Sequence, residues 1–125
     1  MADSKTIVLV GQNLFFLGRV ESLAESQGYE TRRATTEAAF WKHCNAQKPA
    51  LVLVDLEGDP DTWRQVLAGV HSQLKGIRVI AFGPHEDTQA LEQARRLGCD
   101  LALSKGEFNR DLPQIIAGLT TDLQF

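Results

Sequence analysis

Cysteine is scarce in this sequence: the chain has two, Cys44 and Cys99, in separate segments without metal-ligand spacing. Such usage predicts a reducing, cytoplasmic location rather than a disulfide-stabilised secreted protein. Long apolar runs are also missing, and none approaches the ~20 residues that cross a bilayer, so we expect no membrane association. Charge of one sign is not in excess, because the net charge is only −3. This balance gives no electrostatic reason to expect nucleic-acid binding.

The motifs of common enzymes are absent as well. The segment Gly11–Asn13 lacks the glycine spacing of a dinucleotide-binding loop, and no serine-centred nucleophile elbow occurs. The histidines His43, His71 and His85 are scattered and have no cysteine at ligand spacing. The sequence therefore predicts a protein that is not an enzyme and that holds no cofactor.

What the chain does have is a regular alternation of short apolar runs and amphipathic segments. In Ala50–Asp55, five apolar residues follow one another without a break and end on a carboxylate. Such runs indicate strands buried on both faces of a parallel sheet. The predicted strands cover residues 6–10, 29–34, 50–55, 77–82 and 100–104. The predicted helices cover 14–27, a segment between Thr35 and Pro49, 60–74, 87–97, and a last helix that follows a Lys105-Gly106 turn and has Pro113 in its first turn.

Strands that alternate with helices at these short spacings predict an α/β fold. We expect a five-stranded parallel sheet, doubly wound by helices on both faces, with the flavodoxin-like strand order 2-1-3-4-5. Residues 1–120 are expected to form this single domain, and residues 121–125 a short C-terminal tail.

In this topology the carboxyl ends of several strands converge, and ligands bind there. The residues at these ends are Gly11, Gln12, Asp55, Gly83 and Lys105. This set contains one carboxylate and one ammonium group, which is little for a metal ion to bind. We therefore expect the carboxylate of Asp55 and the ammonium group of Lys105 to form a salt bridge.

With these strand ends in place, the sequence resembles the receiver domains of bacterial two-component response regulators over nearly its whole length. The resemblance rests on segments whose order and spacing match a receiver: Ile7–Val10, Gly28–Glu30, Pro49–Leu56, Gly98–Asp100 and Ser104-Lys105. It implies the receiver fold and a place in phosphorelay signalling. It also implies that Asp55 corresponds to the phosphoacceptor aspartate and Lys105 to the lysine that pairs with the phosphoryl group.

The chain departs from that family at its other functional positions. The acidic pair that holds Mg²⁺ in receivers corresponds to Gly11 and Gln12, and the hydroxyl residue that ends strand four corresponds to Gly83. The aromatic switch position on strand five corresponds to Ala102. Because Mg²⁺ prefers several oxygen ligands, including carboxylates, we expect Asp55 to be phosphorylated slowly or not at all.

The acidic loop after strand three leaves one alternative open. Glu57, Asp59 or Asp61 could fold back and supply a metal ligand, and Glu57 is the nearest. Asp55 and Glu57 are therefore weak candidates for an Mg²⁺ site under this alternative. The competing interpretation is a solvated turn in which Asp59 caps the following helix.

Two pairs of adjacent aromatic residues lie on predicted helices, Phe15-Phe16 and Phe40-Trp41. Neighbouring residues on a helix cannot face the same way, so one member of each pair is expected to be exposed. An exposed aromatic side chain here is a candidate contact for a partner.

Three functions remain after these observations. The favoured one is a receiver-like signalling domain, degenerate in its pocket, that acts through protein–protein interaction without phosphorylation. The first alternative is an active receiver phosphorylated on Asp55 with Mg²⁺ help from a loop carboxylate, and the second is a small flavodoxin-like enzyme or nucleotide binder. The resemblance implies another signalling protein or an attached effector domain as partner, or a second copy bound through the Thr88–Leu119 face.

Overall fold

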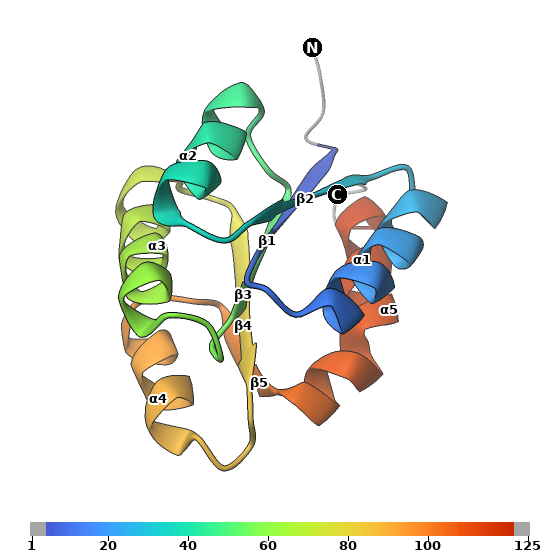
Figure 1. Cartoon of the computed structure of the whole chain (residues 1–125). Coiled ribbons are helices and arrows are strands. Elements are labelled where there is room, and N and C mark those ends of the chain that lie inside the picture. Colours follow the sequence, from blue (N-terminus) through green and yellow to red (C-terminus); the bar gives the residue numbers. More distant parts are fainter. Residues whose placement is uncertain (1–4, 122–125) are drawn as a thin grey trace.

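The computed structural model of the chain describes residues 5–121, in which strands and helices alternate (Figure 1). The elements are β1 (Thr6–Val10), α1 (Leu14–Ser26), β2 (Glu30–Ala34), α2 (Glu37–Ala46), β3 (Leu51–Asp55), α3 (Pro60–Gln73), β4 (Arg78–Gly83), α4 (Thr88–Arg96), β5 (Leu101–Ser104) and α5 (Lys105–Thr121). All strand pairs are parallel, and their order is β2-β1-β3-β4-β5. The predicted fold class and strand order are confirmed, and every strand boundary lies within one residue of its prediction.

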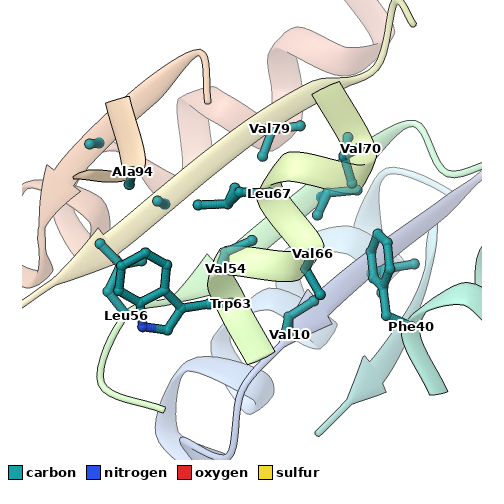
Figure 2. Close-up of a cluster of buried hydrophobic side chains, with 14 of the residues drawn as sticks. Val10, Phe40, Val54, Leu56, Trp63, Val66, Leu67, Val70, Val79 and Ala94 are labelled. Carbon is teal, nitrogen blue, oxygen red and sulfur yellow. The ribbon is translucent and has the colours of Figure 1, made fainter. Parts of the chain in front are cut away.

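The helices form two layers, with α1 and α5 on one face of the sheet and α2, α3 and α4 on the other (Figure 1). Successive residues of a strand point to opposite faces of the sheet. Because helices cover both faces of β1 and β3, the side chains on both faces of these strands must be apolar. In β3, Val52 and Val54 pack toward α3, whereas Leu51 and Leu53 pack toward α1 and α5. Figure 2 shows the core on the α3 side. This double burial explains why the apolar runs in the sequence do not alternate with polar residues.

Four helices begin at side-chain caps that the sequence contains. Asn13 accepts a hydrogen bond from the Phe16 N–H at 3.2 Å, and Thr36 and Asp87 cap α2 and α4 in the same way. Asp59 caps α3 ahead of Pro60, as predicted. These oxygens satisfy N–H groups that have no partner inside the helix.

The start of α5 differs from the prediction. The Ser104 N–H donates to Glu107 Oε1 at 2.9 Å, and the Glu107 N–H donates to Ser104 Oγ at 3.1 Å. This reciprocal capping box begins the helix at Lys105, so the predicted Lys105-Gly106 turn is wrong. Pro113 consequently lies inside α5 rather than in its first turn.

Proline inside a helix leaves the carbonyl four residues earlier without its helical donor, and for Pro113 that carbonyl belongs to Asn109. Arg19 of α1 provides a donor for this carbonyl. Its Nη2 donates to the Asn109 backbone oxygen at 3.0 Å, and its Nε donates to Asn109 Oδ1 at 3.0 Å. One guanidinium group therefore supplies the hydrogen bond that the helix lacks at Asn109, and it also links α1 to α5.

No helix within the described residues is long and apolar enough to cross a membrane. The predicted tail of residues 121–125 falls almost wholly outside the described residues, and Thr121 is the last residue of α5.

Candidate functional site

The strand ends bring Gly11, Asp55, Gly83 and Lys105 to the same edge of the sheet, as the topology requires. Asp55 ends the central strand β3 and is only 5% exposed. Its Oδ1 accepts one hydrogen bond, from the Glu57 N–H at 2.9 Å. Burial raises the pKa of the Asp55 carboxyl, and the Lys105 ammonium opposes this by lowering it. Asp55 is thus a largely desolvated carboxyl group at the centre of the site.

Gly11 lies directly against Asp55. Its φ is +150°, and a Cβ built on it would lie 2.6 Å from Asp55 Cβ and 3.3 Å from Asp55 Oδ2. The Gly11 N–H is held by the Ala34 carbonyl at 3.0 Å. A residue with a side chain would be strained at this φ and would displace Asp55. Position 11 therefore has no room beside Asp55 for the side chain of a metal-binding carboxylate.

Gly83, at the end of β4, is covered by the residue that follows Asp55. A Cβ at Gly83 would lie 3.1 Å from Leu56 Cβ. Leu56 is 4% exposed, and its N–H donates to the Phe82 carbonyl at 2.8 Å. A hydroxyl-bearing side chain at position 83 would thus meet a packed leucine rather than an open pocket.

Lys105 forms an ion pair with Glu57, so the expected Asp55–Lys105 salt bridge is wrong. The Glu57 carboxylate is directed to Lys105 rather than to a metal shared with Asp55. Both side chains are about one-third to one-half exposed, at 32% and 45%. A pair in such contact with water stabilises the fold by at most about 1 kcal/mol.

The other loop carboxylates are engaged as well, and Asp61 pairs with Arg64 at 3.6 Å. Asp59 accepts hydrogen bonds from the Asp61 N–H at 3.1 Å and from Thr62 Oγ1 at 3.3 Å, which is the role of a helix cap. Gln12 is exposed. No group of three or more potential metal ligands occurs among residues 5–121.

The cavity beside Asp55 is small. It has a volume of about 30 Å³ and is lined by Val10, Gly11, Gln12, Thr35, Asp55, Gly58, Asp59, Thr62 and Trp63. A buried water needs ~10–15 Å³ measured in this way, so the cavity has room for about two waters. Mg²⁺ keeps several waters in octahedral geometry and prefers more than one carboxylate when no phosphate is present. The residues at this site do not fit that ion.

The switch position of the receiver family is also without its usual side chain. Ala102 on β5 is 8% exposed, and its carbonyl accepts a hydrogen bond from Arg95 of α4 at 3.2 Å. Three phenylalanine side chains gather between α1, β4 and α5. Phe82 and Phe108 stack with centroids 4.1 Å apart, and Phe16 meets both rings edge-on. Sequence reasoning missed this cluster, because nothing local signals that three distant phenylalanines meet.

Comparison with known proteins gives a consistent picture of the fold. No protein-family model and no curated protein matches the chain. The receiver domain of NtrX from Brucella abortus matches with a TM-score of 0.73 at 22% identity, over 90% of this chain and 94% of that one. The receiver domain of the TMAO respiratory response regulator TorR matches with a TM-score of 0.80 at 17% identity, over 94% and 97%. This chain has the receiver-domain fold.

The receiver fold also occurs within longer chains. A structure of NtrX from Brucella abortus matches with a TM-score of 0.74 at 17% identity over 98% of this chain, but over only 29% of its own length. This chain therefore spans less than a third of that protein. At such low identities the receiver fold is established by the superposition, whereas the chemistry must be judged from the residues at the strand ends.

Proposed function

We propose that this chain is a two-component-type signalling domain that works through protein–protein contact and does not depend on phosphorylation of Asp55. The receiver fold supports the signalling role. The observation that carries the rest is that Gly11 lies against Asp55 and leaves no room beside it for the side chain of a metal-binding carboxylate.

Phosphoryl transfer depends on cations placed around the charge that develops on the moving group. At this site the nearest ammonium, Lys105, is paired with Glu57. Gly83 has no hydroxyl group, and Leu56 packs against the position that a Cβ at residue 83 would take. Burial also raises the pKa of the Asp55 carboxyl, because the charged form is less stable here than in water. These features support a domain recognised in one conformation.

In this proposal the domain has no enzymatic activity and no cofactor, and it acts in the bacterial cytoplasm. Its partner is another signalling protein or an effector domain on the same polypeptide. The longer NtrX chain supports the second arrangement, since the receiver fold there is one part of a larger protein. Self-association through Thr88–Leu119 is a separate possibility for the same fold.

The test is incubation with Mg²⁺ and acetyl phosphate, followed by intact-mass measurement. We expect no gain of a phosphoryl group in the wild-type protein. An active receiver treated in parallel shows that the reagent works, and Asp55→Asn identifies the site of any label. A stoichiometric gain in the wild type that is absent in Asp55→Asn would overturn the proposal in favour of an active receiver.

A further inference from the structure

A hollow of about 480 Å³ lies at the edge of the sheet opposite to Asp55, where β4 and β5 begin. It is bounded by the end of α3, the turn that leads into β4, and the turn that joins α4 to β5. Its volume is in the range of sites that bind small molecules. We refer to it as the lower hollow. It shares no residue with the cavity beside Asp55.

The floor of the lower hollow is apolar and belongs to the core on the α3 side. Val70 and Val79 are 2% and 5% exposed, and Figure 2 shows both side chains in that core together with Leu67. Leu74, which is half-buried, and the buried Ile77 add to the apolar lining. A ligand that rests on side chains already ordered by packing requires little further ordering of the protein when it binds.

The wall on the β5 side is fixed by two reciprocal hydrogen bonds. The Val79 N–H donates to Asp100 Oδ2 at 2.7 Å, and the Asp100 N–H donates to the Val79 carbonyl at 2.8 Å. Asp100 is the one acidic residue in the lining. Its carboxylate is therefore engaged in holding the start of β4 and β5 together.

His71 of α3 forms another part of the wall, because its ring lies against Gly98. Gly98 has a φ of +102°, and a Cβ built on it would lie 2.5 Å from His71 Nδ1. A side chain at position 98 would be strained at this φ and would displace the imidazole. The glycine thus leaves the imidazole its place at the lower hollow.

Positive charge exceeds negative charge around the lower hollow. Lys75 and Arg78 line it together with His71, against the single carboxylate of Asp100. Lys75 is exposed, and its ammonium group has no ion-pair partner within residues 5–121. The His71 ring likewise makes no hydrogen bond to the described part of the chain. In a protein whose net charge is −3, this local excess of cations favours an anion.

We propose that the lower hollow binds a small organic anion, a molecule with an apolar body and one carboxylate group. The body lies on Val70, Leu74 and Val79. The carboxylate pairs with the Lys75 ammonium and accepts a hydrogen bond from the His71 ring, and such charge-assisted bonds are stronger than neutral ones. This site goes beyond the proposed signalling function and does not depend on it, because it lies at the other edge of the sheet from Asp55.

Lys75 also has a structural role to set against this proposal. It follows the end of α3, where a cation complements the helix dipole. That role alone requires neither an apolar floor nor a bound molecule. A test must therefore measure binding as well as stability.

The probe is 2-naphthoate, titrated into the ¹⁵N-labelled protein. We expect saturable amide shifts at residues 70–79 and 98–100, and an affinity that falls as the salt concentration rises. The neutral 2-naphthamide has the body without the charge, and acetate has the charge without the body. Each is expected to bind at least tenfold more weakly than 2-naphthoate.

Variants separate the lower hollow from general attraction. Lys75→Met should weaken 2-naphthoate binding at least fivefold and leave 2-naphthamide within about twofold, whereas the loss of a helix-dipole contact would change only the melting temperature. Lys42→Met removes an exposed lysine of α2 that does not line the hollow, so it is the matched control and should leave both affinities unchanged. Leu74→Trp fills the hollow and should abolish saturable binding. If Leu74→Trp does not fold, the exposed substitution Lys75→Met still tests the proposal.

Four outcomes would overturn the proposal. The first is the absence of saturable shifts at millimolar 2-naphthoate, and the second is a set of shifts centred on the strand ends around Asp55. The third is unchanged 2-naphthoate affinity in Lys75→Met, or equal affinity for 2-naphthamide or acetate. The fourth is an acidic peptide that binds the same residues at least tenfold more tightly than 2-naphthoate, because the lower hollow would then belong to a protein interface. The acetyl phosphate assay is independent of all four, so failure of the signalling proposal can be told apart from failure of this one.

Discussion

Restoring the lost carboxylate at position 11 should damage the fold rather than rebuild a metal site. In Gly11→Asp, a non-glycine residue must adopt a φ of +150°, and its Cβ would lie 2.6 Å from Asp55 Cβ. Backbone strain of this kind costs about 1–3 kcal/mol, and overpacking a filled site costs about 1–3 kcal/mol more. We therefore expect a total loss of about 2–6 kcal/mol in the free energy of unfolding. That is a large share of the ~5–15 kcal/mol typical of a domain.

Gln12→Asp is the matched control, because it adds the neighbouring carboxylate of the receiver pair at an exposed position. An exposed substitution of this kind changes stability by about 0.5 kcal/mol or less. Urea unfolding measures both variants, and a shifted midpoint at constant m reports the change in stability. Trp63 fluorescence during Mg²⁺ titration reports metal binding, since Trp63 lines the cavity beside Asp55.

A free energy of unfolding for Gly11→Asp within about 0.5 kcal/mol of the wild type would contradict this expectation. Saturable quenching at millimolar Mg²⁺ in a stable Gly11→Asp protein, alone or with Gln12→Asp, would contradict it as well. Either result would mean that the backbone at Gly11 can move away from Asp55 at little cost.

Three further predictions concern the buried Asp55, the contact of Arg19 with α5, and the capping box at Ser104. Burial raises the pKa of Asp55 in the folded protein above its unfolded value of ~3.9. The contribution of this group to stability is therefore fully present below the unfolded pKa, and it is lost as the pH rises through the folded pKa. Asp55→Asn should therefore stabilise the protein at pH 7 and lose that advantage as the pH falls toward 4; a pH-independent difference in urea unfolding would contradict this. Arg19→Met should lower the free energy of unfolding by about 1–3 kcal/mol, because it leaves the Asn109 carbonyl without a hydrogen-bond donor. In a Pro113→Ala background the loss should be about 1 kcal/mol smaller, because the helix then supplies that donor. Additive effects in this double-mutant cycle would contradict the role given to Arg19. Ser104→Ala should cost about 1 kcal/mol in thermal or urea unfolding, because it removes one half of the capping box, and an unchanged melting temperature would contradict that role.

Much of the fold could be predicted from local features of the sequence. Apolar runs such as Ala50–Asp55 mark strands that are buried on both faces, and Asn13, Thr36 and Asp87 cap helices through bonds to N–H groups three residues away. The start of α5 was predictable too, because Ser104 and Glu107 have capping-box spacing, but the expected turn at Lys105-Gly106 obscured it.

The sequence by itself determined which residues stand at the strand ends, because the apolar runs stop there. It also determined that Asp55 has no neighbouring acidic pair. Only the tertiary structure decided that the Gly11 backbone lies against Asp55 and that Lys105 turns to Glu57. The physical reason is range: caps and strand patterns depend on residues a few positions apart, whereas these contacts depend on how separate segments of backbone approach one another.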